Sequence, residues 1–117
     1  MHLPGLELAG PLEGLPWRET RHEGVEWIDL APEADGPART VLIRMRPGHG
    51  YPRHRHLGAE DVLVLSGGYA DEDGRVVTAG DFVRYERGSV HEPTALAGSS
   101  AADCVLFAVA HGGTEPA

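Results

Sequence analysis

Turns that contain glycine interrupt this sequence at intervals of about ten residues, which leaves room for short strands and excludes long helices. The clearest strand is "RTVLIRMRPG", where Val41, Ile43 and Met45 alternate with Leu42 and Arg44. No segment keeps a helical period. Many short strands between such turns favour a closed or sandwiched antiparallel sheet. We therefore predict an all-β fold, a small antiparallel β-barrel or double-stranded jelly roll.

The remaining strand-like segments extend over most of the chain. They are "VEWIDL", "EDVLVLSGG", "DFVRYERGS", "VHEPTAL", "ADCVLFAVA" and a hairpin in "YADEDGRVVTAGD" that turns at Asp73-Gly74. A length of 117 residues suits one domain. We expect residues 1–38 to form an N-terminal arm and first strand packing on the barrel, residues 39–110 the barrel core, and residues 111–117 a C-terminal tail.

Charge and apolar content limit the classes of partner. The net charge of −8 argues against a nucleic-acid backbone or an anionic membrane as the main partner. No apolar run approaches the roughly 20 residues that span a bilayer, and the first residues lack the basic and apolar pattern of a signal peptide. We therefore expect a cytoplasmic protein. The lone Cys104 alternates with Leu106, which predicts a buried, inert thiol.

Two histidines one residue apart precede a glutamate in "PRHRHLGAED". In a strand, His54 and His56 face the same side, so both imidazoles can reach one ion. Glu60 has the same parity and follows a short, flexible segment. His91, in the distant "GSVHEP", offers a further ligand. These four residues are the predicted metal ligands.

Imidazole and carboxylate together suit divalent Zn, Fe, Mn, Ni, Cu or Co, and this donor set does not select among them. Four protein ligands leave up to two open positions on a six-coordinate ion, as Lewis-acid or oxygen chemistry requires. Alternatively, "RHRH" is a basic edge strand that discourages edge pairing. The conjunction with Glu60 and His91 favours the metal. No catalytic residue can be identified from spacing.

Other polar residues carry weaker signals. His49 is better explained as a solvated turn residue than as one that orients a ligand, and His2, His22 and His111 are expected to face solvent. The acidic segment 71–73, "DED", is predicted to be a solvated hairpin tip, because it lacks the ligand spacing of a calcium loop.

Aromatic residues in strands more often lie in the core or on the surface of a barrel, but one or two of five side chains are expected to line a pocket above the metal. The candidates are Tyr51, Tyr69, Phe82, Arg84 and Tyr85. On the first clear strand, the face that carries Arg44 and Arg46 is expected to be solvated or part of an interface.

The chain resembles the cupins. Its Gly48, His54, His56, Glu60 and Gly67 match the first cupin motif, G-x(5)-H-x-H-x(3,4)-E-x(6)-G, at every spacing. The second motif, G-x(5)-P-x-G-x(2)-H-x(3)-N, is matched by the residues Gly80, Gly88 and His91, whereas Glu86 replaces its proline and Ala95 its asparagine.

Within the cupins, three turns are similar to the ChrR-like group, whose domain forms the C-terminal half of zinc-dependent anti-sigma factors. They are "GAED" at 58–61, "DEDG" at 71–74 and "GSVHEP" at 88–93. The resemblance implies a jelly roll with His54, His56, Glu60 and His91 around one divalent ion, Zn or Fe before Mn or Ni.

The resemblance also implies two alternative functions. Some relatives are iron-dependent dioxygenases that cleave small diketones, and others are zinc-binding sensor modules without catalytic activity. Because 117 residues leave no room for the helical half of an anti-sigma factor, a complete anti-sigma factor is not expected. Either function implies a small-molecule ligand or substrate, and a homodimer that pairs through sheet edges is expected.

Overall fold

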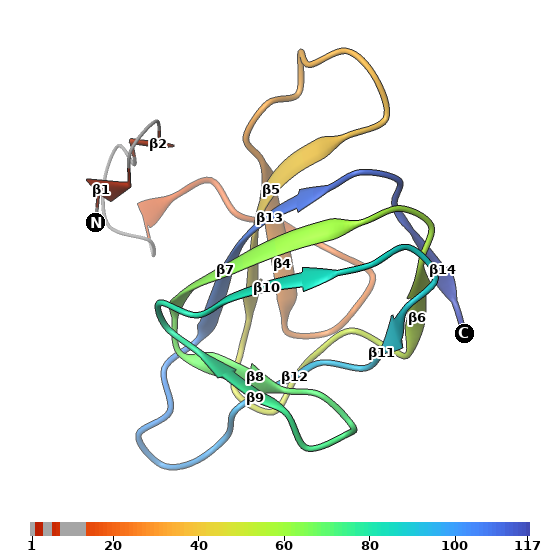
Figure 1. Cartoon of the computed structure of the whole chain (residues 1–117). Helices are drawn as coiled ribbons and strands as arrows, with labels where there is room; N and C mark the ends of the chain where they lie inside the picture. Colours follow the sequence, from red (N-terminus) through yellow and green to blue (C-terminus); the bar gives the residue numbers. More distant parts are fainter. Residues whose placement is uncertain (1, 4–5, 8–13) are drawn as a thin grey trace.

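The computed structural model describes residues 2–3, 6–7 and 14–117, and Figure 1 shows their strands. The strands are β1 (His2–Leu3), β2 (Leu6–Glu7), β3 (Arg18–Glu19), β4 (Val25–Asp29), β5 (Arg39–Met45), β6 (His54–His56), β7 (Glu60–Ser66), β8 (Gly68–Ala70), β9 (Val76–Thr78), β10 (Phe82–Tyr85), β11 (Val90–His91), β12 (Thr94–Ala95), β13 (Cys104–Ala110) and β14 (Thr114–Pro116). The described part contains no helix with the length and apolarity needed to cross a membrane.

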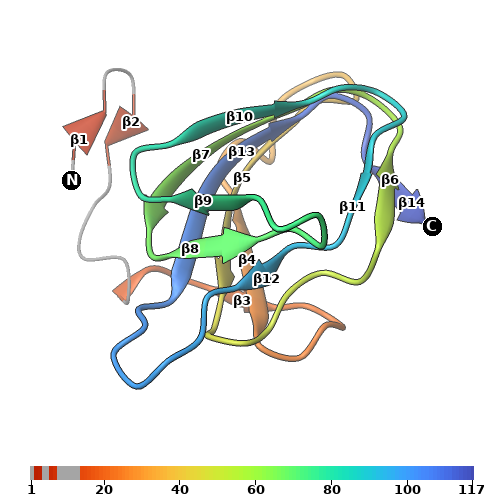
Figure 2. The same cartoon turned by 60° about the horizontal axis from the view of Figure 1, so that its bottom comes forward.

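The largest sheet has six antiparallel strands in the order β10-β7-β13-β5-β4-β3. At its centre, Leu106 of β13 lies opposite Ile43 of β5 on one side and Val64 of β7 on the other. Two smaller sheets, β12-β8-β9 and β11-β6-β14, complete the molecule. In Figure 2 the first lies in front of the large sheet and the second stands at the right of the view. The predicted all-β, antiparallel fold is confirmed.

Strand alternation divides the large sheet into two packed faces. The inner face carries the main core, to which Val41, Met45 and Leu106 belong. The outer face carries a second cluster around Leu42, with Trp17 packed against it. Because residues opposite one another in adjacent strands share a face, the alternation predicted for "RTVLIRM" correctly separates these clusters.

The outer face is more covered than the sequence suggested. Arg44 was expected on a solvated or interface face, but it is only 8% exposed. Its guanidinium lies 2.9 Å from Glu26 Oε1 and 4.6 Å from the centre of the Trp17 ring. Glu26 of β4 and Trp17 thus cover Arg44, although alternation alone would place this residue in solvent. Arg46, on the same face, is exposed.

The segment expected to be a C-terminal tail contains a strand. In β14, Thr114 pairs with His56 and Pro116 pairs with His54, so β6 has a partner on both edges. The sequence did not predict this strand, because "GGTEPA" has neither apolar alternation nor β-branched enrichment.

Two glycines of the first histidine motif have structural reasons to be glycine. Gly48 and Gly67 have φ angles of +81° and +61°, which other residues adopt at a cost. A Cβ on Gly67 would also lie 2.5 Å from the Asp103 carbonyl oxygen. These positions therefore shape the turns that bound the ligand segment and need not bind anything.

Leu42 tests whether the outer cluster contributes to stability. It is fully buried, so Leu42→Ala should lower the free energy of unfolding by about 2–5 kcal/mol. Val76 is 55% exposed, so Val76→Ala should change the free energy of unfolding by less than about 0.5 kcal/mol. Urea denaturation of both variants measures the difference. Equal stabilities would mean that the outer face is not packed in solution.

Cys104 lies in the core with no exposed surface, and burial raises the pKa of its thiol to about 12. The thiolate is the reactive form, so the native protein should resist a thiol reagent at neutral pH. We expect the thiol to be labelled slowly in buffer and rapidly in denaturant. Mass spectrometry measures the extent of labelling over time. Rapid labelling of the folded protein would contradict the burial of this strand.

Candidate metal centre

Three histidines from two strands lie together at one end of the barrel. His54 and His56 belong to β6, and His91 belongs to β11, where it pairs directly with His54. One potential ligand atom from each imidazole lies within 4.8 Å of those of the other two. Strand alternation explains why the first two share a face, and antiparallel pairing explains how the third reaches them.

Each imidazole of β6 is held through its Nδ1. His54 Nδ1 lies 2.9 Å from the Pro52 carbonyl oxygen, and His56 Nδ1 lies 3.1 Å from that of Ser89. For His54, the bond favours the tautomer that carries the proton on Nδ1, which leaves the Nε2 lone pair for a metal. Nε2 of His56 is hydrogen-bonded to a carboxylate, and a metal ion would take the place of that proton. The two rings are therefore oriented as ligands of one ion require.

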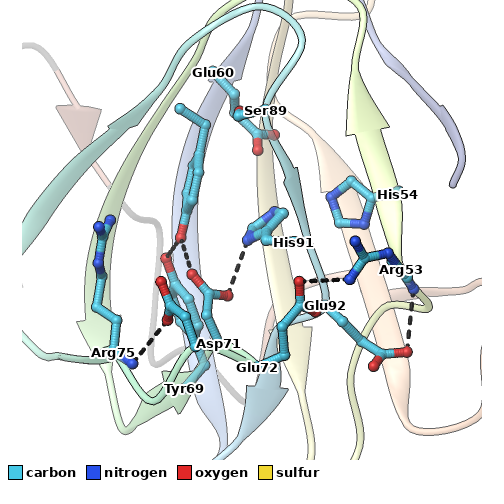
Figure 3. Close-up of polar contacts among 12 residues, drawn as sticks. Arg53, His54, Glu60, Tyr69, Asp71, Glu72, Arg75, Ser89, His91 and Glu92 are labelled. Atoms are coloured by element: carbon cyan, nitrogen blue, oxygen red, sulfur yellow. Dashed lines mark hydrogen bonds and ion pairs between the residues drawn. The ribbon is translucent and has the colours of Figure 1, made fainter.

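His91 is held by a carboxylate. Its Nδ1 lies 2.9 Å from Asp71 Oδ1, and the Tyr85 hydroxyl donates a hydrogen bond of 3.1 Å to Asp71 Oδ2. Tyr85 is in turn hydrogen-bonded to the hydroxyl of Tyr69. Figure 3 shows Asp71 between His91 and Tyr69. A chain of polar side chains thus extends from the barrel interior to the third imidazole.

The prediction of a solvated acidic tip is wrong for Asp71, which is only 8% exposed, whereas Glu72 and Asp73 are exposed as predicted. Tyr69 points into the core from β8, and Asp71 follows it by two residues, so it faces the same way. Period-two alternation through the end of β8 was the signal that could have identified this residue.

Glu60, at the start of β7, brings a carboxylate to the histidines from the large sheet. Its Oε1 lies 3.1 Å from His56 Nε2. In the register of the sheet, Glu60 lies opposite Tyr85 of β10, so both side chains face inward at the same level. All four predicted ligands therefore lie in one region, with Glu60 beside the group of three imidazoles.

The imidazoles of β6 differ in their affinity for protons. Burial lowers the pKa of His54. Burial also acts to lower the pKa of His56, but its hydrogen bonds with Glu60 and the Ser89 carbonyl outweigh it and raise the pKa above the ordinary value. A divalent ion bound to Nε2 of His56 would also attract the negative charge of Glu60. A donor set of imidazoles and a carboxylate fits such an ion.

A cavity of about 240 Å³ opens beside this cluster, and His54, Glu60 and His91 form part of its wall. Most of the remaining wall is apolar: Trp27, Val41, Ile43, Met45, Val62 and Leu106. Concave apolar sites with a few polar groups are typical of small-molecule binding.

One or two of the five pocket candidates were expected to line this cavity, and three of them do: Tyr51, Tyr69 and Tyr85. Phe82 is 63% exposed, and Arg84 is exposed and paired with Asp61, so neither belongs to the wall. Both alternate with the inward residues of β10 and therefore face outward.

Among the described residues, the group of three does not include His22, His49 or His111. His49 is half-buried, and its ring packs so closely on Gly24 that a Cβ there would lie 2.3 Å from its Cγ. His22 was expected to face solvent but is half-buried, with its ring centre 5.3 Å from that of Tyr51. His111 is exposed as predicted, whereas the side chain of His2 lies outside the described part.

Comparison with solved structures supports the fold. The chain matches a structure of Rhodobacter sphaeroides SigE in complex with the anti-sigma ChrR at 33% identity and a TM-score of 0.71, over 86% of this chain and 50% of that one. It matches an RmlC-like cupin of Ralstonia eutropha JMP134 at 22% identity and a TM-score of 0.74, over 85% of this chain and 64% of that one.

A third match is an acetylacetone dioxygenase from Acinetobacter johnsonii, at 14% identity and a TM-score of 0.72, over 97% of this chain and 78% of that one. At this identity the likeness concerns the fold alone. Among curated proteins, none matches the chain.

The chain spans about half the length of the ChrR-complex chain that it matches. The comparison with protein-family models matches the ChrR cupin-like domain over residues 7–113, which is most of the sequence. The predicted jelly roll of cupin type is confirmed, and the chain belongs to the ChrR cupin-like family.

Proposed function

We propose that His54, His56, His91 and Glu60 hold one divalent metal ion. The convergence of three imidazoles within 4.8 Å supports this proposal, as does the Glu60 carboxylate 3.1 Å from His56 Nε2. Hydrogen bonds at Nδ1 of His54 and His91 orient these rings with Nε2 as the ligand atom, a common arrangement for histidine ligands. Zinc and iron both fit this donor set.

We further propose that the chain is a metal-dependent dioxygenase for a small, oxygen-rich substrate of diketone type. The observation that carries this proposal is the apolar cavity of about 240 Å³ with His54, Glu60 and His91 in its wall. An iron(II)-type ion would supply Lewis acidity and redox chemistry there. The apolar walls would exclude water and hold the carbon skeleton.

Tyr51 is the residue of the wall best suited to orient such a substrate. Its ring centre lies 5.9 Å from that of His54. Burial first, and the nearby Glu60 second, raise the pKa of its phenol to about 12. The hydroxyl therefore stays protonated and can donate a hydrogen bond to a substrate oxygen beside the ion.

The second candidate function is a zinc-binding sensor or regulatory module without catalytic activity. The specific observation that favours it is 33% identity over 86% of this chain to the SigE–ChrR complex structure. In this case the cavity would admit a ligand or oxidant that changes how the domain contacts a partner protein.

We also propose that two copies associate through β10, an edge strand of the large sheet. Phe82 supports this, since it is 63% exposed on that edge. Light scattering should give the mass of a dimer for the unmodified chain and of a monomer for Phe82→Glu. A monomer in both cases would contradict the proposed pairing.

Removal of one imidazole tests the metal centre. We expect His54→Ala and His91→Ala each to lower the metal content by about tenfold or more, because each removes a direct ligand. His111→Ala is the matched control, since His111 is exposed and lies outside the cluster. Elemental analysis of protein purified without added metal measures the content, and full occupancy in both ligand variants would disprove the assignment.

Oxygen uptake separates the enzyme from the sensor. The iron-loaded protein is incubated with a panel of small diketones that includes acetylacetone. Uptake that depends on both iron and diketone supports the dioxygenase. Tightly held zinc in the purified protein, with no uptake after iron loading, supports the sensor and contradicts the enzyme.

A further inference from the structure

Asp71 is a buried carboxylate that, among the described residues, forms no ion pair with an arginine. It is 8% exposed, and among the ion pairs of the described residues its partner is His91. A buried negative charge is costly unless it is paired and hydrogen-bonded. Its two oxygens accept hydrogen bonds from His91 and Tyr85. A divalent ion bound by the other nitrogen of that imidazole would add a positive charge close to the carboxylate.

The hairpin that carries Asp71 does not require its carboxylate. The turn is closed by backbone bonds from Gly74 N to the Asp71 carbonyl and from Asp71 N to the Arg75 carbonyl. The side chain that caps the turn is Asp73, whose Oδ1 accepts a bond from Arg75 N. The Asp71 carboxylate is therefore directed at His91 and Tyr85 and has no evident role in forming the turn.

Tyr85 connects this carboxylate to both histidine strands. Its ring stacks on His56 at 5.1 Å with an angle of 9° between planes, and its centre lies 4.1 Å from that of His91. Because its hydroxyl donates to Asp71, the shared hydrogen bond with Tyr69 must be donated by Tyr69. The donor order from Tyr69 to Tyr85 to Asp71 is thus determined.

Resting on the metal centre proposed above, we propose that Asp71 and Tyr85 are positioning residues for the metal. Asp71 accepts the Nδ1 proton of His91, which holds this ring in the tautomer whose Nε2 faces the ion. Tyr85 holds Asp71 through its hydroxyl and packs its ring against His56 and His91. The negative charges of Asp71 and Glu60 together balance a divalent ion, so the loaded centre is formally neutral.

The experiment compares Asp71→Asn, which removes the charge with little change in shape, with Tyr85→Phe, which removes only the hydroxyl and keeps the stacked ring. The matched control is Glu72→Gln. Glu72 is the adjacent carboxylate of the same hairpin, and it pairs with Arg53, 2.9 Å away, and not with a histidine. Zinc dissociation constants are measured for the full chain by competition with a chelator of known affinity.

We expect Asp71→Asn to weaken zinc binding about 10- to 100-fold, as is typical when a group that orients a histidine ligand is lost. Tyr85→Phe should weaken it by a smaller factor, because the carboxylate remains but is less well held. Glu72→Gln should bind zinc as the unmodified chain does. An Asp71→Asn affinity equal to that of Glu72→Gln would overturn the proposal.

A spectroscopic readout distinguishes positioning from a general effect on structure. Nitrogen NMR of the histidine rings without metal, at about pH 8 where imidazoles are ordinarily neutral, should show His91 as the Nδ1-protonated tautomer. Asp71→Asn should give a mixture of tautomers for His91 while His54 stays unchanged. An unaltered His91 tautomer in this variant would also overturn the proposal.

The test still gives an answer if the Asp71 variant fails to fold or if the unmodified chain binds no metal. If Asp71→Asn does not fold, Tyr85→Phe decides alone, and zinc affinity equal to the control would then overturn the proposal. If the unmodified chain binds no zinc, cobalt or iron, the metal centre itself is wrong. That result differs from one in which the unmodified chain binds metal and the Asp71 variant binds it equally well.

Discussion

The antiparallel pairing of β6 with β11 is the constraint on which the rest of the candidate site depends. It sets His91 directly opposite His54, while alternation along β6 keeps His56 on the same face. Neither strand is long enough to be stable by itself, so both depend on the sheets around them. The large sheet then supplies Glu60 and Tyr85 from opposite positions of β7 and β10. Backbone hydrogen bonds thus determine where each polar group of the site lies.

Burial gives these groups their chemical character. Asp71 and His56 are almost fully buried, yet each has partners for its polar atoms. In the described residues, no fully buried side-chain nitrogen or oxygen lacks a hydrogen-bond partner. A satisfied polar network of this kind rigidifies its members, since moving one would leave another unpaired. The side chains of the site are therefore held in place by their hydrogen bonds to one another as well as by the strands that carry them.

The sequence predicted most of the longer strands, the two faces of the first clear strand and the four residues that lie together at the candidate site. These followed from alternation in segments such as "RTVLIRM" and from motif spacing. It failed for Asp71, Arg44 and β14, each for a physical reason. Burial of Asp71 and Arg44 depends on neighbours that are distant in the sequence, Tyr85 and Trp17. The pairing of β14 comes from the backbone, which polar residues can provide as well as apolar ones.

The position of β6 between β11 and β14 has a consequence for the thermodynamics of metal uptake. A short strand with partners on both edges is ordered before any ion arrives, as are the imidazoles that it carries. Binding would then draw little on coupled folding, in contrast to small domains that fold only around their metal. Calorimetry would accordingly register a small change in heat capacity. The preference among metals would reflect the size and geometry of a preorganised cage.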